Sequence, residues 1–161
     1  MNDQVERLAQ RFKQNNEQLI TAAEGCTTEE WRTMATDDER AVGTVAHHLA
    51  SSYGVQCDLI QGIASGESVP AVTWDMVHEM NAEHAEEHAV PTQDETLELL
   101  QENGRTMAQL IRKLDDDQLQ RTAEIPFLDE EPVTAKLFVE QAVIEHIELH
   151  LKSMQTAAGR L

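Results

Sequence analysis

The clearest helical pattern in the chain runs over residues 134–157, TAKLFVEQAVIEHIELHLKSMQTA. On a helical wheel at about 100° per residue, its polar side chains gather on one face, namely Gln141, Glu145, Glu148, Lys152 and Gln155. The opposite side holds two histidines and their apolar neighbours, namely His146, His150, Val139, Ala142, Val143 and Leu149. This pattern predicts an amphipathic helix that packs on a core and carries two histidines on its buried face.

Three other segments repeat the spacing of three and four residues between apolar side chains that indicates a helix. Residues 2–24 end at Gly25, and residues 44–64 end before Ser65 and Gly66. Residues 74–114 are interrupted by Pro91, so they predict either one kinked helix or two abutting helices. Together the four segments predict an all-α fold, and we expect a single four-helix bundle domain over residues 1–161.

The connections between these helices also carry local signals. Thr27-x-x-Glu30 and Asp115-x-x-Gln118 are capping boxes, which predict short helical turns. The acidic residues 37–39 are expected in an exposed loop, and residues 121–132 in an irregular or extended connection. The bundle is expected to have one long crossover loop. No convincing alternating strand pattern occurs.

The charge balance limits the possible partners. The chain of 161 residues has 12 Lys and Arg against 30 Asp and Glu, a net charge of −18. Phosphates and anionic lipids are repelled by such a charge, so we expect neither a nucleic acid nor a membrane partner. There is no apolar run of about 18 residues, and Cys26 and Cys57 form no disulfide framework. We therefore expect a cytoplasmic protein with reduced cysteines.

The seven histidines are clustered, and this is the strongest functional signal in the sequence. His146 and His150 are four residues apart on the predicted buried face, so both ring nitrogens can reach one ion. The alternative is that each imidazole is satisfied separately by a hydrogen bond. Burying two imidazoles without a ligand costs desolvation twice, which weakens this alternative but leaves both open.

A third ligand comes from residues 44–64. On the wheel, His48 lies about 70° from the centre of the apolar face and His47 about 170° from it, so His48 is expected to face the bundle and His47 water. Ser52 and Gln56 share the inward sector, which indicates a polar pocket or a partly wet interior. His48 together with His146 and His150 would form a three-ligand site with open positions, the pattern of a catalytic rather than a structural metal.

The middle cluster, His84 and His88, competes with this assignment. If the acidic side chains of residues 79–87 face solvent, then Asn81, His84 and His88 lie on the opposite side of that helix. They could lie at a solvated rim, line the mouth of the pocket, or supply a fourth ligand. The tryptophans, Trp31 and Trp74, are expected to pack in the core.

Four short motifs resemble, in their order and spacing, those of the DinB-like superfamily of small bacterial metal-binding four-helix proteins. They are Thr27–Trp31, Val45–Leu49, Asp75–Glu83 and Glu145–His150, and they span nearly the whole chain. In that family, a histidine followed by leucine on the second helix and an H-x-x-x-H on the last helix bind a divalent ion. The resemblance therefore implies zinc or nickel on His48, His146 and His150. Because His47 lies beside His48, the ligand from the second helix is a choice between the two.

The resemblance also implies a class of reaction. Some relatives are transferases or isomerases that use bacillithiol, mycothiol or glutathione, including mycothiol-dependent maleylpyruvate isomerase, whose N-terminal domain is related to this family. The leading hypothesis is an enzyme whose metal activates a low-molecular-weight thiol for attack on an electrophilic small molecule. The alternatives are a hydrolase that uses a metal-bound water, and a non-catalytic, stress-related metal-binding module. The pocket candidates are Asn81, His84, His88 and Ser52, and the resemblance makes a homodimer plausible.

Overall fold

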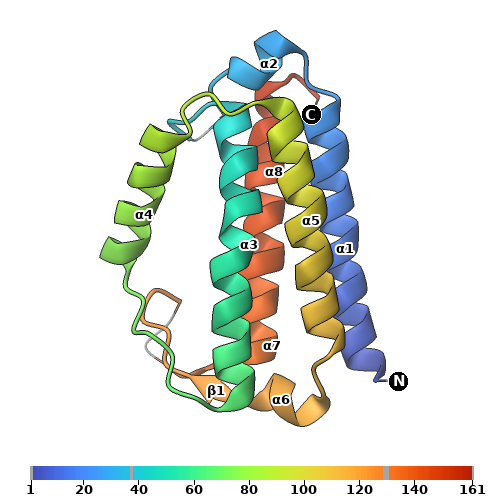
Figure 1. The fold of residues 1–161 in the computed structure, drawn as a ribbon, viewed down its shortest axis with the longest axis vertical. Helices are drawn as coiled ribbons and strands as arrows, with labels where there is room; N and C mark the ends of the chain where they lie inside the picture. The colour runs from blue at the N-terminus through green and yellow to red at the C-terminus, as the bar shows by residue number, and fades with distance from the viewer. Residues whose placement is uncertain (1, 37, 129–130, 161) are drawn as a thin grey trace.

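The computed structural model describes residues 2–36, 38–128 and 131–160. Four long helical segments lie side by side as a bundle (Figure 1). They are α1 (Asp3–Glu24), α3 (Val42–Ser65), α5 (Gln93–Arg112) and a composite last segment of α7 (Ala135–Phe138), the π-helix η1 (Val139–Glu145) and α8 (His146–Ala157). The prediction of an all-α four-helix bundle is confirmed.

The capping residues that the sequence predicts begin helices in the structure. The side chains of Thr27 and Asp115 close both capping boxes and begin α2 (Thr28–Arg32) and α6 (Asp116–Gln120). Thr73, Thr92 and Thr134 each accept a backbone hydrogen bond at the start of α4 (Trp74–Glu87), α5 and α7, respectively. By contrast, α3 begins after Ala41, which offers no side-chain cap, so sequence alone does not mark that boundary.

A small antiparallel ladder joins the two ends of the connection at residues 121–132. It pairs β1 (Thr122–Ala123) with β2 (Val133–Thr134). Each strand has two residues, which is too short for an alternating pattern to be visible in the sequence. Residues 129–130 of this connection, and Asp37 of the predicted acidic loop, lie outside the described residues.

The long crossover connection joins α3 to α5 and contains α4 (Trp74–Glu87). In Figure 1, α3 and α5 run in the same direction, and α4 runs the opposite way outside them, returning the chain to the end where α5 begins. Of the two alternatives predicted for residues 74–114, the structure therefore has two separate helices rather than one kinked helix, and the chain reverses near Pro91. The indole nitrogen of Trp31 donates a hydrogen bond of 2.8 Å to the Pro91 carbonyl and ties this reversal to α2.

The core is centred on α3, in which every residue from Val42 to Ala50 is buried. Phe12 of α1 and Tyr53 of α3 meet edge to face, with ring centroids 5.4 Å apart. The Tyr53 hydroxyl donates to Asn16, whose amide donates to the Leu100 carbonyl of α5. Apolar packing and this satisfied polar chain together hold three of the bundle helices in register.

The two tryptophans have different environments. Trp31 is 6% exposed, as expected for a core side chain, but Trp74 is 55% exposed. The Trp74 ring rests against Phe127, with centroids 5.7 Å apart. The prediction for Trp74 is wrong because α4, which it begins, lies outside the bundle rather than within it.

Two further findings concern the whole of the described chain. Cys26 is half-buried and Cys57 is buried, and both are free thiols. Among the described residues, no helix combines the length and the apolar character that a membrane span requires.

Candidate metal centre

Three imidazoles from two bundle helices converge in the structure. His48 lies on α3, and His146 and His150 lie on consecutive turns at the start of α8. The Nε2 atom of His146 is 3.4 Å from that of His48 and 3.1 Å from that of His150. These are the three residues that the sequence selected, and the fold brings all of them together.

The nitrogen spacings match those around a small tetrahedral cation. Zinc–nitrogen bonds of about 2.0–2.1 Å at tetrahedral angles place neighbouring ligand nitrogens about 3.3 Å apart. Both nitrogen–nitrogen separations in the triad lie close to this value. Imidazole is a preferred ligand of zinc, nickel, copper and iron, so the donor set fits a divalent transition metal ion.

Burial keeps these imidazoles neutral, which is the form that binds metal. Burial, followed by the charges of His146 and Arg40, lowers the pKa of His48 to about 2. Burial, followed by the charge of His150, lowers the pKa of His146 to about 3. The pKa of His150 is also lowered, chiefly by burial, while the Asp38 carboxylate acts in the opposite direction.

Asp38 is a neighbour of the triad that the sequence did not reveal. Its Oδ2 atom lies 3.8 Å from Nδ1 of His150, on the side of that ring away from the other histidines. The Arg40 guanidinium donates a hydrogen bond of 2.8 Å to each of the two carboxylate oxygens of Asp38. Burial alone would raise the pKa of Asp38, but the hydrogen bonds and charge of Arg40 outweigh it and lower that pKa.

The prediction of an exposed acidic loop is therefore wrong for Asp38, whose side chain is 12% exposed. The pair Asp38 and Arg40 lies in a loop, two residues apart, with no periodicity to indicate which way its side chains point. The only sequence signal is an acidic and a basic residue just before α3, and such pairs are usually solvated.

The π-helix η1 immediately precedes the first α8 ligand. The Gln56 amide of α3 donates a 2.9 Å hydrogen bond to the Ala142 carbonyl within η1. A π-turn holds about one residue more than an α-turn, so a regular wheel cannot be carried through it. Leu149, expected on the buried face, is 67% exposed, because the buried residues of α8, Ile147, Leu151 and Met154, lie on the other side of the helix.

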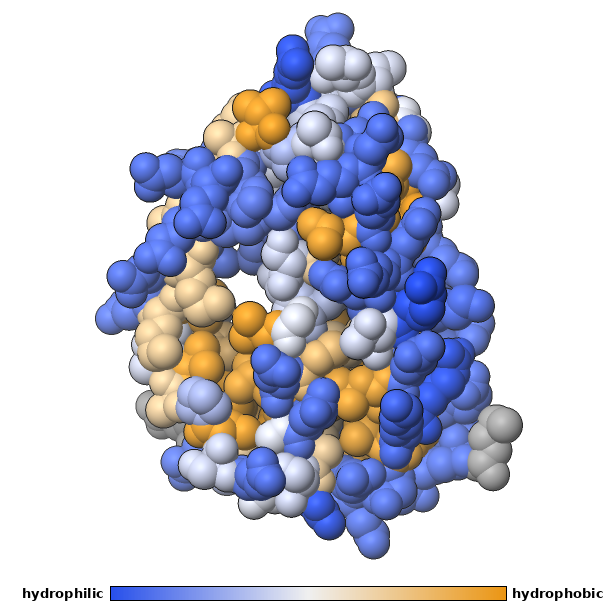
Figure 2. Space-filling view, viewed as in Figure 1, coloured by the Kyte–Doolittle hydropathy of each residue, from blue (hydrophilic) through white to orange (hydrophobic). Residues whose placement is uncertain are grey.

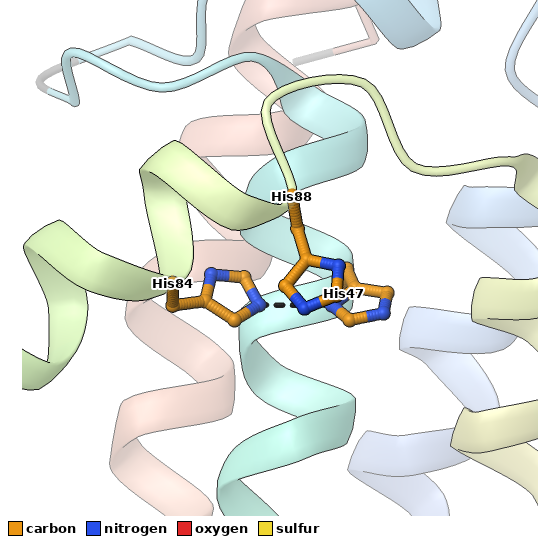
Figure 3. Close-up of side chains that lie close together, drawn as sticks. All are labelled: His47, His84 and His88. Carbon is orange, nitrogen blue, oxygen red and sulfur yellow. Dashed lines mark hydrogen bonds between the residues drawn. The ribbon is translucent and has the colours of Figure 1, made fainter.

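His47 is also placed differently from the prediction. It is 3% exposed, not solvated, because α4 covers the face of α3 that points away from the bundle core. Its Nδ1 atom lies 2.8 Å from Nε2 of His84. With His88 these residues form a second triad of imidazoles, shown in Figure 3.

The remaining predicted pocket residues have varied positions. His84 and His88 are half-buried and group with His47 rather than with His146 and His150. The His84 ring is nevertheless 5.6 Å from the His48 ring, so the two triads are neighbours. Ser52 donates to the His48 carbonyl of its own helix, and Asn81 is half-buried on α4 outside both triads.

Comparison with known proteins supports the fold and the family. YfiT from Bacillus subtilis, described as a probable metal-dependent hydrolase with an unusual four-helix bundle topology, is 23% identical, with a TM-score of 0.74 over 99% of this chain and 90% of its own. Mycothiol-dependent maleylpyruvate isomerase is 12% identical, with a TM-score of 0.73 over 96% of this chain and 63% of its own. No curated protein matches the sequence. The DinB superfamily model matches residues 11–154, and this chain therefore belongs to the DinB superfamily.

Proposed function

We propose that His48, His146 and His150 bind one divalent metal ion, zinc or nickel, at the catalytic centre of an enzyme. The reaction we propose is the transfer of a low-molecular-weight thiol to an electrophilic small molecule, or a thiol-dependent isomerisation. The observation that supports the metal is the spacing of the three Nε2 atoms at 3.4 and 3.1 Å. The membership of the DinB superfamily supports the same site.

The number of ligands favours catalysis over a purely structural role. Structural zinc sites usually have four protein ligands, whereas catalytic sites have three and an open position. In the part of the chain that the structure describes, the group around His48 contains three possible ligands. When bound, the ion would supply Lewis acidity that lowers the pKa of a thiol or a water in the open position.

The neighbouring side chains suit an anionic reactant. The charge of Arg40 contributes to the lowered pKa of each histidine of the triad, so this guanidinium acts at short range. Its Nη1 atom is buried and has no hydrogen-bond partner among the described residues. That nitrogen is available to bind a carboxylate or thiolate, while Asp38 holds the rest of the guanidinium and orients His150.

A second candidate reaction uses the same centre. YfiT is described as a probable metal-dependent hydrolase, and its likeness covers 99% of this chain. A hydrolase would need water rather than a thiol, and the same three histidines and Arg40 would serve it. Thiol dependence of turnover is therefore the property that separates the two reactions. A non-catalytic, stress-related metal-binding protein is the third alternative.

The test combines metal content with thiol-dependent turnover. Protein purified without an affinity tag or chelator is analysed for zinc and nickel, then assayed on an aryl halide with glutathione, bacillithiol or mycothiol. We expect turnover that depends on one of these thiols and is lost in His146→Ala. The matched control is His78→Ala, an exposed histidine outside both triads, which should keep full activity.

The outcomes distinguish the candidates. Turnover of ester or amide substrates without any thiol would contradict the transferase and support the hydrolase. A metal that is present but never exchanges a ligand, together with a large loss of thermal stability on its removal, would support the non-catalytic alternative. An unchanged metal content in His146→Ala would contradict the proposal that His48, His146 and His150 bind the metal.

The partners and the location of the protein remain proposals. A small-molecule substrate fits the proposed reaction, and the net charge of −18 disfavours nucleic acid and membrane surfaces. The homodimer rests on the family resemblance, and light scattering on the purified protein would measure it. The cytoplasmic location and the single domain over residues 1–161 are likewise predictions from the sequence.

A further inference from the structure

We propose that His47, His84 and His88 form a second binding site for a divalent transition metal ion, separate from the triad around His48. One ring nitrogen of each residue lies within 4.8 Å of the others. The ion would join α4 to α3. This inference does not depend on any reaction at the first site.

The side chains in Figure 3 already converge on one another. Nδ1 of His47 lies 2.8 Å from Nε2 of His84. The rings of His47 and His88 are stacked with centroids 4.1 Å apart, and those of His84 and His88 are 4.9 Å apart. His84 and His88 are only half-buried, so small side-chain rotations can bring the nitrogens to the spacing of about 3.3 Å that zinc ligands require.

The environment of these rings favours a bound cation. His47 is 3% exposed, so water has little access to its ring. An ion would bind Nδ1 of His47 and Nε2 of His84, the two nitrogens that face each other. The carboxylate of Glu95 acts on His47 as a nearby negative charge that offsets the charge of the ion.

The position of α4 gives this ion a structural role. Among the described residues of α4 none is buried, so apolar packing contributes little to its attachment. Figure 2 shows an opening between this helix and the bundle. At its C-terminal end, the Thr44 hydroxyl donates to the carbonyls of His88 and Ala89. A metal on His47, His84 and His88 would add a cross-link one turn along the same helix.

The spacing on α4 explains why both of its ligands can reach one ion. His84 and His88 are four residues apart, which places them on the same face of the helix. His78, on the same helix, has its ring beside Trp74 with centroids 5.6 Å apart and belongs to neither triad. The chain therefore offers a control histidine on the same element.

The first experiment counts zinc ions. The protein is stripped with a chelator, reloaded with excess zinc, dialysed and analysed for zinc per chain. We expect two ions in the unmodified protein and in His78→Ala, and one ion in His84→Ala, in His88→Ala and in His146→Ala. Circular dichroism checks that each variant is folded.

The second experiment asks where the ion acts. In His146→Ala, which retains only the proposed second site, zinc should slow hydrogen exchange of the amides in residues 74–87 at least severalfold. In His146→Ala combined with His84→Ala, zinc should have no effect on those amides. The double variant keeps His47 but lacks His84, so any effect of zinc on these amides that remains would come from binding outside the proposed second site.

Three results would overturn the proposal. One is a single zinc per chain in the unmodified protein, and another is two ions retained in both His84→Ala and His88→Ala. The third is a single ion that is lost both in His84→Ala and in His146→Ala, which would mean one site shared between the triads. Loss of one ion in His146→Ala is the expected result for the first site, and the hydrogen-exchange measurement on α4 then tests the second site independently.

Discussion

His47 and His48 are neighbours in the chain, yet their imidazoles belong to different triads. Successive residues of a helix project about 100° apart, so one ring points to α8 and the other to α4. Either can bind metal only because a different helix supplies its partners. A substitution of His47, expected from the sequence to have little effect, is now expected to disturb a buried site.

Asp38 gives a prediction for a single side chain. Replacing it with Asn removes the charge beside Nδ1 of His150 and exchanges one of the two oxygens that accept from Arg40 for an NH2 group. Loss of an outer carboxylate of this kind typically weakens metal affinity about tenfold or more. Competition with a chromophoric chelator measures the affinity, and Glu39→Gln, an exposed neighbour, is the control. An unchanged affinity in Asp38→Asn would show that this carboxylate does not orient the ligand.

Among the secondary-structure elements, η1 has the clearest functional consequence. A π-turn inside a helix shifts the faces of the residues that follow it. His146 and His150 come directly after η1 and face His48, whereas Leu149 faces solvent. The irregular element therefore sets the direction of both α8 ligands, and Gln56 contacts it from the opposing helix.

Gln56 gives a prediction at this level. Gln56→Met keeps the length of the side chain but removes the donor to the Ala142 carbonyl. We expect the free energy of unfolding to fall by about 1 kcal/mol and the metal affinity of the first triad to fall with it. Urea denaturation measures the first quantity and chelator competition the second. Gln61→Met, on an exposed position of the same helix, should change neither.

For the molecule as a whole, the notable property is the number of imidazoles that folding removes from water. Two neighbouring triads lie against one helix, in a protein with a net charge of −18. The negative charge attracts cations to the protein, and the buried neutral rings are ready to bind them. Without metal, the same rings make folding sensitive to acid.

The pH dependence of stability follows from the lowered pKa values. The pKa is about 2 for His48 and about 3 for His146, against an ordinary value of 6.5. Below about pH 6.5 the unfolded chain therefore binds more protons than the folded one, and the free energy of unfolding falls as the pH falls. Each of these two histidines accounts for a loss of up to about 2 kcal/mol between about pH 7 and pH 5.

Urea denaturation of metal-free protein at several pH values measures this loss. His48→Gln should flatten the curve between about pH 7 and pH 5, because it removes one of the groups that protonate on unfolding. His78→Gln should leave the slope unchanged, since that ring is exposed. Equal stability at the two pH values in the unmodified protein would contradict the burial of neutral histidines.

The helices and their caps could be predicted because each depends on residues close in the chain, whereas the first triad was assembled from helical wheels and the family resemblance. Periodicity reveals the buried face of residues 134–157, and Thr27 and Asp115 cap helices with their own neighbours. The family motifs then selected His48 together with His146 and His150. The prediction of helices and their buried faces does not require the topology to be known, because an amphipathic helix buries the same face against whichever partner covers it.

Contacts between distant segments could not be predicted in this way. The path of α4 outside the bundle buries His47 and exposes Trp74, and no local pattern distinguishes that path from a continuous helix. Asp38 reaches His150 from a loop more than a hundred residues away in the chain. A wheel assumes one regular helix and one solvent, so it fails where a π-turn alters the phase or another helix covers the outer face.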